Sequence, residues 1–306
     1  MIRETLMPTP QIARLTADFN ADLITMARQH LAAHWGPENI ADGDIVLKYF
    51  DSLRRWPTPR PRTVRQADNF LCPQEMEAGW ELLRSKIVRG EDIRPHLGRE
   101  HDRLSHLDGL LNEWDVHHLH LGVKPYFKDP NFMDRTKQLV FALITDDEFF
   151  AINIYPVHGK WETLDILESL HRNWPELIRG CRIEGVAGET LTIEGRRRLR
   201  NANTQTFTTV SDGTVYAPIG GGVACSGVSA VAVMSAASAY RDMKRLQVAV
   251  QEQIEKFLVY LRPRGYSDGM DLKAVLVGIS SHGYKILFSD YGVQANVKLE
   301  NEPAEQ

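Results

Sequence analysis

The stretch that decides the fold is His117-His118-Leu119-His120-Leu121-Gly122, followed at residues 135–159 by RTKQLVFALITDDEFFAINIYPVHG. In the second segment two apolar runs flank Asp146-Asp147-Glu148, a polar triplet that is typical of a turn. We therefore expect a small antiparallel sheet. Its neighbouring strands should lie near 117–121, 138–145 and 149–155, with the last two joined as a hairpin.

The two-residue period of a strand predicts which face of the sheet each histidine of this stretch lies on. Alternate side chains share a face, so His118 and His120 lie opposite Leu119 and Leu121. Because the leucines belong in the core, we expect the two histidines on an open face. Further polar side chains are expected to converge on that face: Arg135, Lys137, Tyr155 and His158.

Two chemistries fit such a cluster. Imidazoles donate and accept protons near neutral pH, and an arginine stabilises a developing phosphorane, so metal-free RNA cleavage is one. Its catalytic residues would be His118, His120, His158 and Arg135. The substrate would be bound by Lys137 and Tyr155, and neither a metal nor a cofactor would take part. In the other, His118 and His120 bind one metal ion, with His158 or a carboxylate as a further ligand, as in a metal-dependent hydrolase. A third interpretation makes the histidines structural and the chain a non-catalytic nucleic-acid or protein binding and assembly module.

The order of these elements resembles the small sheet of RelE/ParE-type ribosome-associated toxins, whose wider group includes barnase-like and colicin-like ribonucleases. The resemblance covers residues 108–161 and depends on strand order, the turn between two apolar strands and the Arg/His set. It implies a metal-independent endoribonuclease with a toxin-like or defence role and RNA as its partner. Those toxins are usually small single domains, whereas this chain continues far beyond the segment on both sides.

An arginine-rich segment, RRWPTPRPRTVR at 54–65, holds three prolines and five arginines and breaks all periodicity. It is either a connector whose arginines pair with nearby carboxylates or a phosphate-binding arm. In the second case Arg54, Arg55 and Arg62 bind substrate, and all five arginines lie at the surface near the histidines. Apolar spacing predicts helices around this segment, over 9–35, 41–53, 73–89 and 102–113.

The C-terminal part mixes helical and extended patterns. We expect a short helix over 163–171, strand character from 181 to 193 and from 204 to 210, a hairpin turn at Asp212-Gly213, and a final hairpin over 284–299. Arg196–Arg200 is a basic cluster, read either as a solvated face or as a nucleic-acid patch. Gly220-Gly221-Gly222 precedes a long helix over 229–261, rich in Ala, Gly and Ser in its first half. The glycines lack the ending of a phosphate loop, which favours close backbone packing over phosphate binding.

The composition limits which classes of protein and which cellular compartment fit this chain. The chain has 306 residues, a formal net charge of −4 and only three cysteines, which argues against a disulfide scaffold or a cysteine zinc site and favours a cytoplasmic protein. Residues 214–240 are uncharged, but their small side chains gain little in lipid, so no membrane association is expected. A protein partner, either an antitoxin or a second copy, would bind through 220–240.

The expected fold class is α+β. We expect a helical region with the arginine-rich segment at 1–95, a central unit with the histidines at 96–180, an α+β region at 181–300 and a disordered tail at 301–306.

Overall fold

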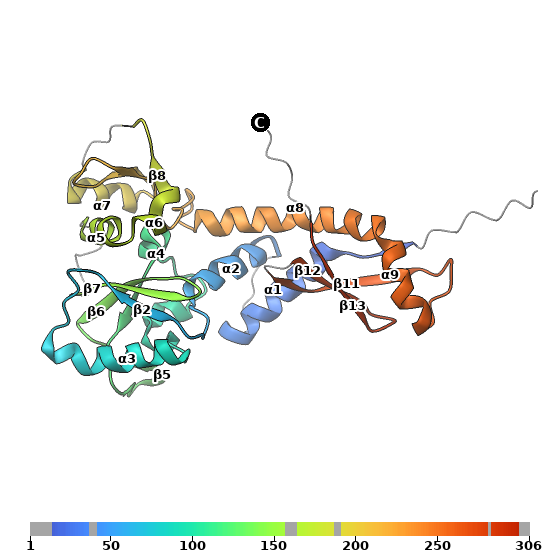
Figure 1. Ribbon diagram of the computed structural model, residues 1–306, viewed down its shortest axis with the longest axis horizontal. Coiled ribbons are helices and arrows are strands. Elements are labelled where there is room, and N and C mark those ends of the chain that lie inside the picture. The colour runs from blue at the N-terminus through green and yellow to red at the C-terminus, as the bar shows by residue number, and fades with distance from the viewer. Residues whose placement is uncertain (1–13, 37–41, 157–163, 187–190, 281–282, 300–306) are drawn as a thin grey trace, which may run out of the picture. The chain divides into compact units, whose positions relative to one another are not determined.

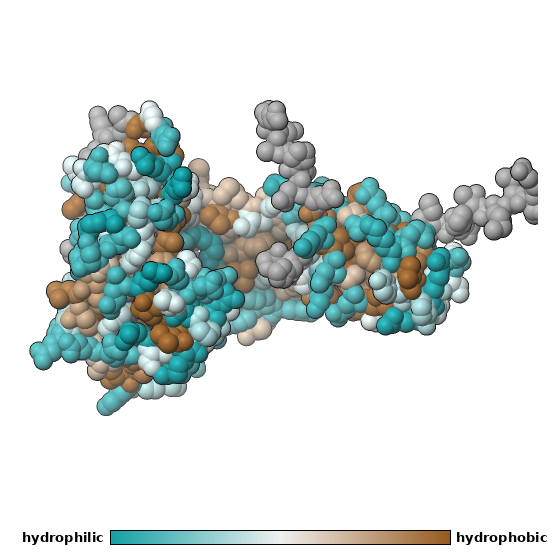
Figure 2. Space-filling model, in the orientation of Figure 1, coloured by the Kyte–Doolittle hydropathy of each residue, from teal (hydrophilic) through white to brown (hydrophobic). Residues whose placement is uncertain are grey.

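The computed structural model describes residues 14–36, 42–156, 164–186, 191–280 and 283–299. Helices and several small sheets make up an α+β fold, as the sequence predicts (Figure 1). The chain forms two compact units, one built from residues 1–49 and 235–306 and the other from 50–234. In the view of Figure 2, apolar residues are scattered among hydrophilic ones on the surface of each unit. Within the described ranges, no helix has both the length and the apolar character needed to cross a membrane.

The 50–234 unit is organised around a four-stranded sheet in the order β2-β7-β6-β3. The strands are β2 (Thr63–Gln66), β3 (Val116–His120), β6 (Gln138–Ile144) and β7 (Glu148–Pro156). β3 and β7 each pair antiparallel with β6, and β6 and β7 form a hairpin closed by the hydrogen bond from Thr145 N to Glu148 O. The predicted neighbours are thus confirmed. The arginine-rich segment adds what the sequence pattern did not show, because β2 pairs parallel with β7 and makes the sheet mixed.

Both faces of this sheet are covered. One face packs against α3 (Glu77–Arg89), where Trp80, Leu83 and Ile87 contact Leu119 and Leu121. The other packs against α4 (Gly109–Trp114), α5 (Asp165–Asn173) and α6 (Pro175–Ile178), through the β6 and β7 side chains Leu139, Phe141, Leu143, Phe150 and Ile152 (Figure 1). The expectation of an open histidine face is therefore wrong for most of the sheet, because β6 is apolar on both sides. On the side of the sheet that α4 covers, the apolar packing is interrupted beside His118 and His120, which line a pocket.

Smaller elements complete this unit. Four short 3₁₀ helices are η1 (Gln74–Met76), η2 (Arg94–His96), η3 (Arg99–Asp102) and η4 (Arg179–Cys181). β4 (Pro125–Tyr126) and β5 (Asp129–Met133) form a hairpin, and β8 (Arg182–Ile183), β10 (Val215–Tyr216) and β9 (Thr208–Thr209) form a three-stranded sheet. The turn at Asp212-Gly213 joins β9 and β10 as predicted. The basic cluster at 196–200 lies on the helix α7 (Ile193–Asn201). Of the strand character expected from 181 to 193, the described residues form only β8.

The other unit pairs a strand from the early part of the described sequence with strands from its last part. Its sheet has the order β1-β11-β12-β13, with β1 (Leu15–Thr16) parallel to β11 (Leu272–Ser280). β12 (Gly283–Phe288) and β13 (Val293–Val297) are the predicted final hairpin. The helices α1 (Phe19–Trp35), α2 (Asp42–Arg55), α8 (Ala230–Glu252), α9 (Ile254–Leu261) and the 3₁₀ helix η5 (Arg262–Arg264) complete the element order.

The boundaries of the two units differ from those expected at residues 95 and 180. Leu15 pairs with Leu272 across almost the whole sequence, a relation that no local pattern announces. The boundaries between the units fall inside α2 and α8 rather than in loops. Residues 301–306, expected to be a disordered tail, lie outside the described residues.

Candidate functional site

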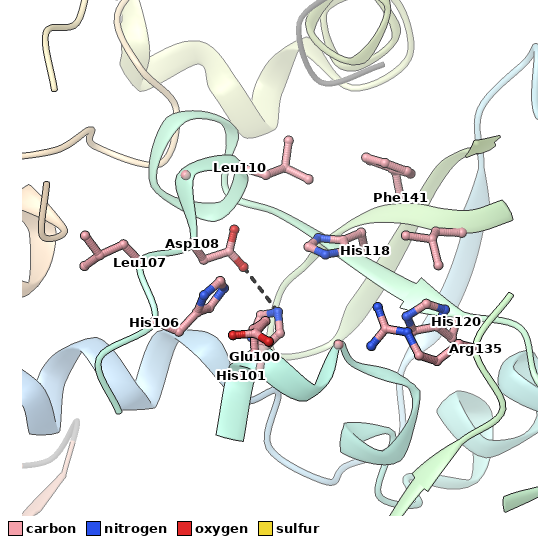
Figure 3. A pocket seen from close by; sticks show the side chains of 13 residues that line it. Glu100, His101, His106, Leu107, Asp108, Leu110, His118, His120, Arg135 and Phe141 are labelled. Atoms are coloured by element: carbon pink, nitrogen blue, oxygen red, sulfur yellow. Dashed lines mark ion pairs between the residues drawn. The ribbon is translucent and has the colours of Figure 1, made fainter. Parts of the chain in front are cut away.

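A pocket of about 220 Å³ lies between the segment 98–110 and strands β3 and β6 (Figure 3). Three groups of side chains line it: the polar residues of the 98–110 segment, two histidines of β3, and Arg135 with the apolar wall of β6. The lining residues are Gly98, Glu100, His101, His106, Leu107, Asp108, Gly109, Leu110, His118, His120, Arg135, Leu139 and Phe141.

Three of the four predicted catalytic residues meet in this pocket. His118 and His120 project from the same face of β3, two positions apart, and Arg135 reaches the pocket from the segment that precedes β6. Figure 3 shows His120 and Arg135 at one end of the pocket and His118 between them and Asp108. His158, the fourth, lies outside the described residues.

The opposite end of the pocket holds residues that the sequence analysis did not select. His101 comes from η3, His106 from the loop after it, and Asp108 caps the N-terminus of α4. One potential ligand atom from each of these three side chains lies within 4.8 Å of the other two. Their pattern, His-x4-His-x-Asp, was present in the sequence but is less conspicuous than the three histidines at 117–120.

The orientation of Asp108 is fixed by the start of α4. Its Oδ1 accepts a hydrogen bond from the Leu111 backbone N–H at 3.0 Å, which is an ordinary helix N-cap. Its Oδ2 lies 3.4 Å from His101 Nε2, is buried, and accepts no hydrogen bond from a described residue. Two ligands bound to one zinc ion at a tetrahedral angle lie roughly 3.3–3.6 Å apart, given bond lengths near 2.1 Å. The His101–Asp108 pair already has this spacing.

Burial keeps the imidazoles of His101, His106 and His117 neutral. Together with smaller contributions from neighbouring histidines and arginines, it lowers the pKa of His101 to about 2 and the pKa of His117 to about 3, although Asp108 acts in the opposite direction at His117. Burial also lowers the pKa of His106. At neutral pH these rings therefore present lone pairs rather than positive charge, which is the form that binds metal ions.

His120 is held by backbone contacts. The Thr136 backbone N–H donates to His120 Nδ1 at 3.1 Å, which assigns the proton of the neutral ring to Nε2. Burial, and then the nearby Arg135, lower the pKa of His120 to about 3. On the adjoining side, His96 Nδ1 lies 2.8 Å from the His120 carbonyl oxygen and donates to it. His120 is therefore a neutral, fixed side chain.

The cations near the pocket differ from those of the arginine-rich segment. Arg135 and Lys137 are exposed, and neither forms an ion pair with a described residue. Arg135 lines the pocket, whereas Lys137 follows it on the surface. Both therefore keep guanidinium or ammonium donors available to a bound anion.

The arginine-rich segment is built into the protein instead. Arg54 donates to Leu111 O, Gly220 O at 3.0 Å and Asn112 Oδ1 at 3.2 Å. Arg55 is 1% exposed and Arg62 is 7% exposed, so the expected surface position of these two is wrong. Arg55 pairs with Asp51, and Arg62 donates to Thr145 O at 2.6 Å beside the β6–β7 turn. Their internal partners favour the connector interpretation.

Two further predicted features are explained by packing. Tyr155, expected to bind substrate, is 7% exposed and its ring packs edge-on against Phe141 with centroids 5.4 Å apart. A Cβ added to Gly220 would lie 2.1 Å from Leu111 O, so the glycine allows two backbone segments to meet. Close packing at Gly220, the interpretation favoured from sequence, is confirmed.

Comparisons with protein-family models, with curated proteins and with solved structures find no match to this chain. The resemblance to RelE/ParE-type toxins thus stays a prediction, and the residues of the pocket carry the functional argument.

Proposed function

We propose that this protein is a metal-dependent hydrolase whose active site is the pocket beside β3. The observation that carries this proposal is the grouping of His101, His106 and Asp108 at one end of the pocket, with ligand atoms within 4.8 Å of one another. Asp108 supports it further, because a buried carboxylate oxygen without a hydrogen bond is costly unless a cation or donor binds there.

Three protein ligands suit a catalytic rather than a structural site. Catalytic zinc sites typically have three protein ligands from histidine and carboxylate and leave the fourth position to water or substrate. A bound divalent ion would supply an activated water and polarise an oxygen of the substrate. Neutral His101 and His106 and the oriented Asp108 are the groups that would hold it.

The remaining side chains give the pocket two further roles. His118 lies beside the ligand group, with its ring centroid 5.8 Å from that of His101, and its buried Nδ1 has no hydrogen-bond partner among the described residues. In the proposed reaction His118 would accept a proton from the attacking water and return one to the leaving group. Arg135 at the other end would bind an anionic oxygen, which favours a phosphate ester or another acidic ester as substrate.

A second candidate is the metal-independent nuclease that the sequence suggests. It is favoured by the meeting of His118, His120 and Arg135 in one pocket. It is disfavoured by His120, because a pKa of about 3 leaves this ring unprotonated at neutral pH and so unable to act there as a general acid. The metal-dependent reaction does not need that proton.

Metal removal and reloading test the proposal. The purified protein, stripped with a chelator, is assayed with bis(p-nitrophenyl) phosphate and with bulk RNA, then again after addition of Zn²⁺ or Mn²⁺. Activity should return only with metal, and His106→Ala should abolish it, whereas the exposed His34→Ala should not. Activity that persists in chelator and is lost in His118→Ala would replace the proposal by the second candidate. Absence of hydrolysis under every condition would favour the binding and assembly module.

A further inference from the structure

The β4–β5 hairpin beside the pocket carries an aromatic surface that the proposed reaction does not use. Phe127 at its tip is 81% exposed, the highest value among the large apolar side chains of the described residues. Tyr126 lies next to it, with ring centroids 5.1 Å apart. Adjoining apolar side chains that are exposed to water and rimmed by polar residues are typical of a surface that binds a partner.

Cations accompany both rings. Lys128 Nζ lies 5.4 Å from the Phe127 ring centroid, and the Arg99 guanidinium lies 5.5 Å from that of Tyr126. Segment 123–137 holds four cationic residues and the two carboxylates Asp129 and Asp134, a local charge of +2 in a chain of net charge −4. The four cationic residues, all exposed, are Lys124, Lys128, Arg135 and Lys137.

The hairpin is joined to the pocket at both of its ends. The Asp134 backbone N–H donates to Lys124 O at 2.8 Å and closes the base of the hairpin, and Arg135, which lines the pocket, follows directly. On the other side, Arg99 connects Tyr126 to the pocket wall, because its neighbours Gly98 and Glu100 both line the pocket. A ligand lying on the hairpin would thus continue into the pocket.

We propose that this hairpin surface binds single-stranded nucleic acid and delivers it to the pocket. Bases would stack on Phe127 and Tyr126, and Lys124, Lys128 and Lys137 would contact the phosphates. A single strand is favoured over a duplex because only unstacked bases offer their faces to aromatic side chains. The proposal names the substrate class of the pocket, and it depends on the proposed function only for what happens to the strand there.

Binding is tested in chelator, so that neither metal nor catalysis is required. Fluorescence anisotropy with labelled 12-residue single-stranded RNA and DNA, and with the matching duplexes, compares the full chain with its variants. Phe127→Ala should weaken single-strand binding by roughly 5- to 150-fold, the effect of one lost base stack. Leu71→Ala is the matched control, because Leu71 is also highly exposed, at 72%, but lies outside the hairpin.

The phosphate contacts are tested by salt. Lys124→Ala combined with Lys137→Ala should lower the slope of log affinity against log salt by roughly 1.4, given about 0.7 for each single-strand phosphate contact. The control Lys244→Ala, an exposed cation on α8 and outside the basic cluster at 196–200, should leave the slope unchanged.

Several results would overturn the proposal while leaving the metal site intact. These are no binding by the parent protein at low salt, equal losses in Phe127→Ala and Leu71→Ala, or no preference for single strands over duplexes. Co-sedimentation with anionic phosphatidylserine vesicles, lost in Phe127→Ala while nucleic-acid binding is absent, would assign the surface to a membrane instead. Conversely, nucleic-acid binding that persists in a protein without metal affinity would uphold this proposal and reject the proposed reaction.

Discussion

Replacing Asp108 by asparagine separates the two functions of that carboxylate. Oδ1 caps α4 by accepting the Leu111 N–H, while Oδ2 faces His101 Nε2 at 3.4 Å. Asparagine caps helices about as well as aspartate, since its amide oxygen can accept the same hydrogen bond. Its amide nitrogen, however, carries no charge and cannot ligate a metal from the Oδ2 position. Asp108→Asn should therefore fold normally and lose the metal.

The size of the effect follows from linkage. A ligand present at 100 times its dissociation constant stabilises the folded protein by about 2.7 kcal/mol. Even the loss of a hydrogen-bond partner outside the ligand shell weakens metal binding by 10- to 100-fold, so the loss of one ligand of three should cost about 100-fold or more. At the same metal concentration the stabilisation would then fall to about 0.4 kcal/mol.

Urea unfolding with and without Zn²⁺ measures this difference for the parent, Asp108→Asn and Asp108→Ala. Without metal, Asp108→Asn should match the parent closely, while Asp108→Ala should be less stable by about 0.5–2 kcal/mol because it also loses the cap. Isothermal titration gives the affinity directly. The reasoning is refuted if Asp108→Asn keeps the full stabilisation by Zn²⁺, since the carboxylate would then not be a ligand.

Three further predictions concern the structure that supports the pocket. Arg54→Ala should destabilise the protein by roughly 3 kcal/mol or more, because the buried oxygens of Asn112 and Gly220 lose a charged donor. Chemical denaturation measures this loss, and an unchanged free energy of unfolding would mean that the arginine has no structural role. Burial lowers the pKa of His96 to about 4 from 6.5, so the unfolded chain takes up a proton that the folded state refuses, and stability is lost as pH falls from 6.5 toward 4. His96→Gln should reduce that loss by roughly 3 kcal/mol, whereas an unchanged pH profile of unfolding would show that His96 contributes nothing to it. Gly79→Ala should prevent stable folding because the new Cβ would lie 1.8 Å from Leu121 O, while Gly43→Ala, with open space around it, should be tolerated in the same thermal unfolding assay.

The central sheet could be predicted because its signals are local. The apolar runs on each side of Asp146-Asp147 specify a hairpin, and the period of β3 places His118 and His120 on one face. Arg135 was found for the same reason, since it directly precedes a strand. These residues indeed line one pocket.

The other half of the site depends on contacts that a linear pattern does not show. His101 and His106 lie in a 3₁₀ helix and a loop, which have no apolar period, and they meet Asp108 in the pocket just before α4 begins. For the arginine-rich segment the sequence allowed a connector or a phosphate-binding arm, and contacts distant in sequence favour the connector. Its prolines suggest an exposed arm, but residues 63–66 become an edge strand, and Arg62 caps the neighbouring turn through Thr145 O.

The division into units was hidden for a related reason. β1 contributes only Leu15 and Thr16, and its partner β11 begins at Leu272. A two-residue strand has no detectable period, so the pairing of β1 with β11 could not be inferred from either segment alone.

X-ray absorption at the zinc edge of the zinc-loaded protein tests the central claim most directly. It should report one zinc per chain with two imidazole nitrogens and carboxylate or water oxygen at about 2.0–2.2 Å, and no sulfur, as expected for His101, His106 and Asp108 with an open position. Loss of one imidazole in His106→Ala would complete the assignment. Sulfur ligands, a shell of oxygens alone, or the absence of stoichiometric zinc would contradict it.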